Sequence, residues 1–281
     1  MLDGRSAKAE TTSATLAVPG ARLYYEVCGS GPVLLMIQSG AGGADGSVNI
    51  APYLADRFTV VSYDRRGLSR SPLERPAGGS EGIEQHSEDC HRLLTALTTE
   101  PAFVFGSSIG ALIGLDLVAR HPEQVTTLVA HEPPAPELLP DEEGDAAERA
   151  QEAVEHAYRR EGLPSAMRAF AVIVGLDVSD READVEIPRP DERRTADTVY
   201  FLTHDAPAVR RYRLDLEALR TARTRVVAAA GRSSADSWPH HCAKVLAARL
   251  DTLFVESPGG HNGHVMRPKA FAAWLSGVLE S

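Results

Sequence analysis

Cysteine is scarce in this chain of 281 residues, which contains three. Cys28, Cys90 and Cys242 are odd in number, far apart and without a C-x-x-C spacing, so the sequence predicts neither a disulfide framework nor a zinc site. Long hydrophobic runs are missing too. No stretch approaches the length of a membrane span, and the first 20 residues lack the apolar core of a signal peptide. We therefore expect a cytoplasmic protein with no membrane segment.

Basic residues are also fewer than acidic ones. The chain has 29 Lys and Arg and 39 Asp and Glu, which give a formal net charge of -10. Nucleic-acid binding needs clustered basic side chains that displace counterions from phosphates, so this composition argues against a nucleic-acid partner. A small organic molecule is the partner that the composition favours. Whether the chain forms a homodimer is left open.

Short apolar runs alternate with amphipathic stretches, which is the pattern of a mainly parallel sheet with helices on both faces. Residues 84–97 and 110–122 predict helices, and a last helix is expected from Pro268. The fold class is therefore α/β. Eight runs rich in Val, Leu, Ala and Phe predict strands at 14–19, 21–29, 32–38, 58–64, 102–107, 126–132, 225–231 and 252–257.

One interval breaks this alternation of strands and helices. Residues 135–215 contain acidic and alanine-rich helical segments but no apolar run that resembles a buried strand. The segment opens with prolines and turn residues, which mark a departure from the sheet. We predict a helical cap inserted after the sixth strand, with residues 1–134 and 216–281 forming the core.

The strongest local motif is G-x-S-x-G at residues 106–110, directly after an apolar strand and before an amphipathic helix. That setting is typical of a nucleophile elbow, in which a serine protrudes from a sharp strand-to-helix turn. Gly106 and Gly110 would let strand and helix approach closely, and Ser108 would lie where a helix N-terminus favours negative charge. The alternative is a glycine-rich helix cap without chemistry.

A serine hydroxyl is a weak nucleophile at neutral pH, so a base must accept its proton. His261 lies in the loop between the last strand and the final helix, where this chain order expects the base. The glycine pair before it suits a tight turn that brings the imidazole toward Ser108. His264, in the same loop, is the competing candidate.

The acid that should orient this histidine is harder to find. In many hydrolases with a nucleophile elbow, this acid lies three positions after the glycine that ends the seventh strand. In this sequence that position is Ser234. Asp236 is nearby, but Glu132 ends the sixth strand and precedes two prolines that fix the backbone. We predict that Glu132 accepts the second imidazole N–H and fixes the tautomer, with Asp236 as the alternative.

Acyl transfer also needs donors for a tetrahedral oxyanion. The backbone N–H of Ile109, next to the nucleophile, is one candidate. The glycine-rich loop at 38–43 supplies the second, and we choose Gly40, with Ser39 and Ala41 as alternatives. No P-loop or dinucleotide fingerprint lies at a strand-helix junction, so we expect neither a metal nor an organic cofactor.

With these residues in hand, the chain resembles the α/β-hydrolase family over nearly its whole length. The matching segments are GSSIG, DRRGLSRS, ARHPEQV and PGGHNGHVMRP. In that family the histidine commonly precedes a proline by seven residues, which favours His261 because Pro268 follows at that distance. The pairing of GSSIGA with AHEPP is similar to the zearalenone lactonases of this family, whose catalytic acid is a glutamate after the sixth strand. The resemblance also implies Gly40 in the oxyanion loop and a substrate-binding cap aromatic at Tyr200 or Phe201.

These residues predict a serine hydrolase of the carboxylesterase or lactonase type. It would cleave a carboxylic ester or lactone of a small hydrophobic substrate through an acyl-enzyme on Ser108. Two alternatives remain on the same scaffold, because a fold does not fix its chemistry. One is a cofactor-independent oxygenase or C–C hydrolase, and the other is a ligand sensor without turnover.

Overall fold

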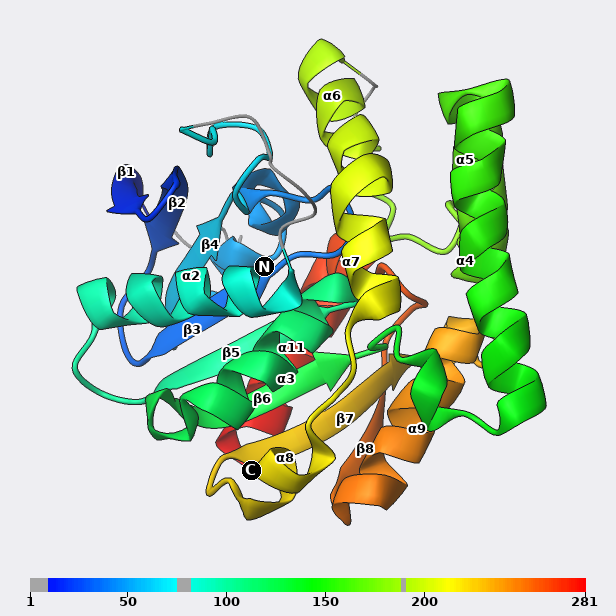
Figure 1. Ribbon diagram of the computed structural model, residues 1–281. Coiled ribbons are helices and arrows are strands. Elements are labelled where there is room, and N and C mark those ends of the chain that lie inside the picture. The colour runs from blue at the N-terminus through cyan, green and yellow to red at the C-terminus, as the bar shows by residue number, and fades with distance from the viewer. Residues whose placement is uncertain (1–9, 75–81, 188–190) are drawn as a thin grey trace.

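The apolar runs of the sequence form one eight-stranded sheet (Figure 1). The computed structural model describes residues 10–74, 82–187 and 191–281, and the eight predicted strands are confirmed within these ranges. The strands are β1 (Thr11–Val18), β2 (Ala21–Cys28), β3 (Val33–Ile37), β4 (Thr59–Tyr63), β5 (Ala102–Ser107), β6 (Val125–His131), β7 (Arg225–Gly231) and β8 (Leu253–Ser257).

The strand order is β1-β2-β4-β3-β5-β6-β7-β8. β2 pairs antiparallel with both of its neighbours, and the pairs from β4 to β8 are parallel. The carboxyl ends of β3 to β8 therefore meet at one edge of the sheet, where open α/β sheets bind their ligands. In the register of β5 on β6, Ser107 lies opposite His131, so Ser108 and Glu132, one residue further on, begin side by side.

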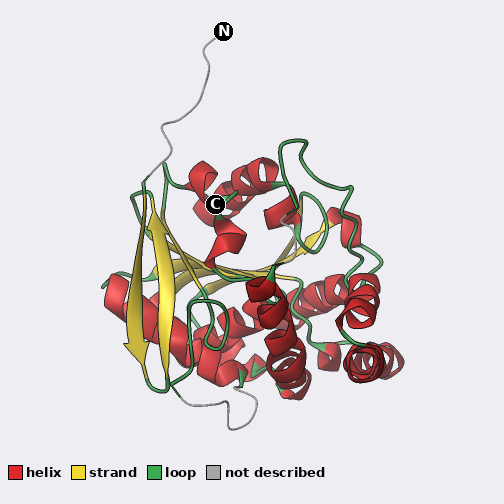
Figure 2. Ribbon diagram, turned by 90° about the horizontal axis from the view of Figure 1, so that it is seen from above, coloured by secondary structure: helices red, strands yellow, loops and turns green. Residues whose placement is uncertain are grey.

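Helices cover both faces of the sheet because the strand residues alternate between two cores (Figure 2). In β3, Leu35 and Ile37 pack on one side, whereas Leu34 and Met36 pack on the other. The first core also contains residues of α2 (Ile83–Leu97), α3 (Ile109–Arg120), α8 (Leu216–Thr221) and α9 (Trp238–Leu250). The second contains residues of α1 (Ala51–Leu54) and α11 (Pro268–Glu280).

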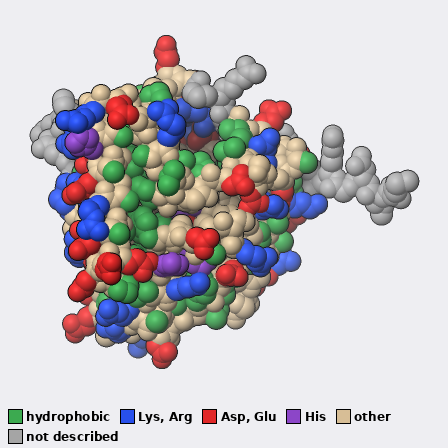
Figure 3. All heavy atoms as spheres, turned by 90° about the vertical axis from the view of Figure 1, so that its right-hand side faces the viewer, with side chains coloured by type: hydrophobic (Ala, Val, Ile, Leu, Met, Phe, Trp, Pro, Cys, Tyr) green, Lys and Arg blue, Asp and Glu red, His purple; other side chains and the backbone are tan. Residues whose placement is uncertain are grey.

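The segment between β6 and β7 is helical in its described part, and no strand occurs among the described residues from 135 to 215. A π-helical turn at 201–205 joins α6 to α7, so these two helices form one column beside the α4 and α5 pair (Figure 1). Figure 3 shows charged side chains of both signs spread over the face that α4 and α5 form. The helices are α4 (Asp141–Glu161), α5 (Leu163–Ile173), α6 (Glu192–Tyr200) and α7 (Ala206–Arg211).

Short helical turns complete the connections between these elements. Among the described helices, none is both long and apolar enough to cross a bilayer. The shorter elements are η1 (Ala44–Ser47), η2 (Pro122–Gln124), η3 (Pro136–Leu138), η5 (Arg232–Ser234) and α10 (Gly263–Met266).

The junction of β5 and α3 depends on two glycines. A Cβ atom added to Gly106 would lie 2.2 Å from the carbonyl oxygen of Gly110, and one added to Gly110 would lie 2.2 Å from that of Ile37. Neither backbone oxygen can move without shifting a strand or a helix. The glycines therefore allow α3 to start directly on top of β3 and β5, as the motif predicts.

We expect Gly106→Ala to lower the free energy of unfolding by at least about 2 kcal/mol, because its methyl group meets backbone rather than a movable side chain. Gly277→Ala in α11 is the matched control, since no atom lies within 4 Å of the added Cβ. The control should be neutral or stabilise the protein by up to about 1 kcal/mol, because alanine favours the helix. Urea unfolding of the two variants measures the difference, and equal effects would contradict this description of the junction.

Candidate active site

Ser108 occupies the turn between β5 and α3 in a conformation that side chains rarely adopt. Its backbone has φ 56° and ψ -121°, outside the regions usual for residues other than glycine. The Ser108 N–H donates to the carbonyl of His131 at 2.8 Å, and the Ser108 carbonyl accepts from the N–H of Ala111 at 2.8 Å. The turn is therefore tied to both β6 and α3. Backbone strain that surrounding hydrogen bonds hold in place is characteristic of functional sites.

Glu132 lies at the matching position after β6, and it also has a positive φ, of 49°. Its side chain is completely buried. One carboxylate oxygen, Oε1, accepts from the N–H of Gly231 at 2.8 Å and from the hydroxyl of Ser234. The other, Oε2, contacts Nδ1 of His261 at 2.5 Å. The carboxylate is thus held by the end of β7 and faces the histidine with its remaining oxygen.

The surroundings of Glu132 keep it ionised. Burial alone would raise its pKa, but the hydrogen bond and charge of His261, the nearby His131 and the Ser234 hydroxyl outweigh that effect. Together they lower the pKa of Glu132 to about 2. At neutral pH a carboxylate therefore accepts the proton on Nδ1, so the opposite nitrogen of the ring is the one that can exchange protons.

His261 follows a tight glycine turn that lies against the end of β7. Gly259 has φ 80°, and a Cβ on Gly231 would lie 2.5 Å from Gly260, so these glycines allow the close approach. The ring is buried, and its Nε2 has no hydrogen-bond partner among the described residues. His261 and Ser108 line the same chamber. The ring therefore has Glu132 at one nitrogen and an unpaired, buried nitrogen at the other.

The two competing residues lie elsewhere. Asp236 is exposed, and the carboxylate that contacts the His261 ring among the described residues is Glu132. His264 is buried with Nε2 at 3.0 Å from Oε1 of Gln38, and its ring packs against Phe105 and Phe271. The structure thus brings Ser108, His261 and Glu132 to one site and leaves Asp236 and His264 outside it.

Two buried histidines near this site stay neutral. Burial lowers the pKa of His131 to about 4, although Glu132 opposes the shift. Burial, together with repulsion of the protonated ring by His131 and His261, lowers the pKa of His264 to about 3. Neutral rings at these positions add no positive charge beside His261.

The loop expected to bind an oxyanion is fixed by a buried arginine. Gly40 has φ 42°, and its carbonyl accepts from the guanidinium of Arg65. The same guanidinium donates to the carbonyl of Gln38 at 3.0 Å and to Asp205 at 3.0 Å. Ile109, which carries the other expected donor, begins α3 and lines the chamber with Ser108. The DRRGLSRS segment, noted in the sequence only as a family match, gave no sign that Arg65 reaches across to the π-helical turn.

The two cap aromatics are placed differently. Phe201 lines the chamber. Tyr200 is not among the chamber's described lining residues, because its ring packs against Gly67 and stacks on His204 with centroids 4.4 Å apart. Consecutive residues on a helix point in different directions, so the side chain of Phe201 can line the chamber while that of Tyr200 points elsewhere.

Two cavities meet at His261. The chamber beside Ser108 has a volume of about 50 Å³, and none of its lining residues is exposed. A cleft of about 440 Å³ runs along the loop that contains Gly40 and reaches exposed residues such as Val48 and Met167. Both cavities are lined by His261 and Phe170. The site therefore combines a narrow side without exposed lining residues and a wide side that reaches exposed residues.

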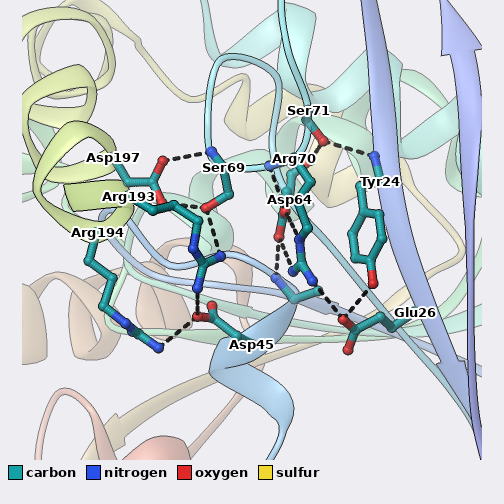
Figure 4. Close-up of polar contacts among 11 residues, drawn as sticks. Tyr24, Glu26, Asp45, Asp64, Ser69, Arg70, Ser71, Arg193, Arg194 and Asp197 are labelled. Atoms are coloured by element: carbon teal, nitrogen blue, oxygen red, sulfur yellow. Dashed lines mark hydrogen bonds and ion pairs between the residues drawn. The ribbon is translucent and has the colours of Figure 1, made fainter. Parts of the chain in front are cut away.

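Helix α6 is fastened to the core loops by charged contacts (Figure 4). Arg193 and Arg194 donate to Asp45 at 3.0 and 2.8 Å. On the same helix, Asp197 accepts from the N–H of Ser69 at 2.6 Å. These contacts hold α6, and with it the π-helical turn that contains Phe201, against the loops that follow β3 and β4. No cluster of three His, Cys, Asp or Glu among the described residues has the arrangement of a metal site.

Acid should destabilise this protein through its buried histidines. Unfolding restores an ordinary pKa of 6.5 to His131 and His264. Below that pH the unfolded state therefore binds protons at these rings that the folded state does not bind. The free energy of unfolding should be steady above pH 6.5 and fall as the pH drops toward 4, by up to about 1.4 kcal/mol per pH unit for each group. Glu132 adds to this loss of stability only below pH 4.5, the ordinary pKa of a glutamate.

The measurement is urea unfolding at a series of pH values for the wild type and His264→Gln, which removes one of the two titrating rings. The variant should lose stability less steeply between pH 6.5 and pH 4 than the wild type does. Identical slopes would show that His264 does not resist protonation in the folded state.

The chain is similar to known proteins both in sequence and in fold. Residues 32–265 match the sequence model of the family described as alpha/beta hydrolase fold. Over 270 residues the chain is 40% identical to the uncharacterized hydrolase YraK of Bacillus subtilis, with 95% of each chain covered. The enol-lactonase from Burkholderia xenovorans superposes with a TM-score of 0.70 at 20% identity, covering 95% of this chain and 100% of that one. An N-acyl homoserine lactone degrading enzyme superposes with a TM-score of 0.68 at 20% identity, covering 94% of this chain and 99% of that one.

Proposed function

The chain belongs to the α/β-hydrolase family, and from this premise we propose that it is a serine hydrolase that cleaves a carboxylic ester or a lactone. The observation that carries the proposal is the position of His261, with Nδ1 at 2.5 Å from Glu132 and Nε2 unpaired among the described residues in the chamber that Ser108 lines. A base held in this way can accept a proton from a serine hydroxyl.

In the proposed reaction, the Ser108 hydroxyl attacks the carbonyl carbon while Nε2 of His261 accepts its proton. Glu132 accepts the hydrogen bond from Nδ1 and stabilises the imidazolium that forms. The N–H groups of Ile109 and Gly40 donate to the oxyanion. His261 then returns the proton to the leaving oxygen, and the C–O bond breaks to give an acyl-enzyme. Water, activated by the same ring, releases the carboxylic acid.

The helical segment at 135–215 acts in this proposal as a cap over the catalytic residues. Phe201 and Val154, which it contributes, line the chamber together with Ile109 of the core. Apolar walls favour a hydrophobic group on the substrate. Because Tyr200 packs away from the chamber against Gly67, the proposed contact with substrate falls to Phe201. An ester or lactone matches the lactone chemistry in the names of the two similar structures.

The first test is covalent labelling of Ser108. A fluorophosphonate should inactivate the enzyme with one adduct per chain on this residue, and Ser108→Ala should abolish both labelling and hydrolysis of p-nitrophenyl acetate. Ser107→Ala is the control, because the hydroxyl of Ser107 is also buried but lies in β5, one residue before the proposed nucleophile. Intact-protein mass spectrometry and a spectrophotometric assay give the two readouts. Undiminished turnover in Ser108→Ala would overturn the proposal, as would unlabelled enzyme with oxygenase activity or ligand binding without turnover.

The second test compares the two carboxylates. Glu132→Gln should lower kcat by about 10³- to 10⁴-fold, because the amide cannot stabilise the imidazolium as a carboxylate does. Asp236→Asn should change kcat by no more than about twofold, since the exposed side chain lies outside the site. The KM values should stay close to that of the wild type. A larger loss in Asp236→Asn than in Glu132→Gln would move the acid to the loop after β7.

A further inference from the structure

Two residues that line the chamber beside Ser108 carry unpaired polar atoms that the proposed reaction does not use. Its walls are mostly apolar, but Gln151 of α4 and Trp238 of α9 also line it. Oε1 of Gln151 and Nε1 of Trp238 are both buried, and neither has a hydrogen-bond partner among the described residues. A buried polar atom without a hydrogen-bond partner costs free energy. Two such atoms on residues that line a cavity therefore indicate that a polar group of a ligand binds there.

The two atoms are complementary in kind. Oε1 of Gln151 can only accept a hydrogen bond, and Nε1 of Trp238 can only donate one. A hydroxyl group donates through its hydrogen and accepts through its oxygen, so it can pair with either kind of atom, whereas a methyl group of similar size pairs with neither. The chamber therefore favours a group that carries a hydroxyl.

Charge limits the ligand further. Glu155 also lines the chamber, and its carboxylate pairs at 3.1 Å with Arg210. No Lys or Arg is among the described residues that line the chamber. A carboxylate or phosphate on the substrate would therefore find no positive partner among these lining residues, and Arg210 is already paired with Glu155. The group that enters should be neutral.

The two cavities at His261 suggest which side of the ester bond enters the chamber. The alcohol must leave and water must enter before the acyl-enzyme can be hydrolysed, and both need access to His261. The cleft of about 440 Å³ gives that access because it reaches exposed residues, whereas the chamber of about 50 Å³ has none in its walls. The group that stays bound through the acyl-enzyme is the acyl group, and it belongs in the narrow chamber.

We propose that the chamber is the acyl-binding site and that Gln151 and Trp238 select a short, neutral acyl group bearing a hydroxyl. The inference rests on the proposed serine hydrolase. Such an acyl group has two sources. One is an open-chain ester of a hydroxy acid. The other is a lactone: Ser108 Oγ bonds to the carbonyl carbon, the ring C–O bond breaks, and the proton passes through His261 to the ring oxygen, which becomes a hydroxyl on the acyl chain.

The experiment uses pairs of p-nitrophenyl esters that differ only by hydroxyl in place of methyl: lactate against isobutyrate, and β-hydroxybutyrate against isovalerate. Each kcat/KM is divided by the rate constant for hydroxide hydrolysis of the same ester, which removes intrinsic reactivity. The wild type should prefer the hydroxy ester of at least one pair on the order of 10- to 100-fold, because its methyl partner leaves both buried atoms unpaired.

Gln151→Leu removes the amide with its unpaired oxygen, and Trp238→Phe removes the indole N–H, while both keep an apolar side chain in place. Both should reduce the preference to about twofold or less, mainly by lowering kcat/KM for the hydroxy ester. Gln124→Leu and Trp274→Phe are the matched controls, because these residues are not among the described residues that line the chamber. Both controls should keep the wild-type preference.

The same variants assayed on γ-valerolactone distinguish the two sources of the hydroxyl. A fall in lactone turnover alongside the hydroxy esters supports ring opening as a source, and a fall for the hydroxy esters alone supports the open-chain substrate. A wild type that hydrolyses both members of each pair equally would overturn the inference and leave the serine hydrolase standing. So would unchanged preference in both variants. Absence of turnover on every ester and lactone would overturn both.

Discussion

The contact between Glu132 and Nδ1 of His261, at 2.5 Å, is the interaction on which the account of this site depends. It fixes the tautomer and the direction of the ring, so that Nε2 is directed away from the carboxylate. The carboxylate is itself fixed, because the N–H of Gly231 and the hydroxyl of Ser234 hold its other oxygen. A charged group placed in this way before any reaction costs no reorganisation when charge develops on the imidazole.

The rest of the fold brings the other parts of the site to this contact. Parallel strands end at one edge of the sheet, and strained turns after β5 and β6 direct Ser108 and Glu132 there. Arg65 joins the backbone of the Gly40 loop to Asp205, which lies in the same π-helical turn as Phe201. The loop and the cap segment are thus connected through a buried ion pair. Movement of either one should therefore affect the other.

Sequence reasoning predicted what depends on local patterns. Apolar runs located the eight strands, and the α/β-hydrolase fold is confirmed by the family match. Strand-end placement identified Glu132, whose contact with His261 agrees with the choice over Asp236, although its catalytic role remains a prediction. Contacts between segments that are distant in the sequence could not be predicted, because no local sequence pattern indicates them. Ser234 was noted only as a missing acid, yet it donates to Glu132 from 102 positions away. The domain boundaries and the cytoplasmic location remain predictions.

The most direct test of the Glu132–His261 contact is proton NMR of the imidazole N–H groups. A strong hydrogen bond from Nδ1 to a carboxylate moves its proton to unusually low field and protects it from exchange with water. We predict one such resonance, lost in His261→Ala, shifted upfield in Glu132→Gln and unchanged in Asp236→Asn. A low-field signal that survives Glu132→Gln, or its absence from the wild type, would contradict the account.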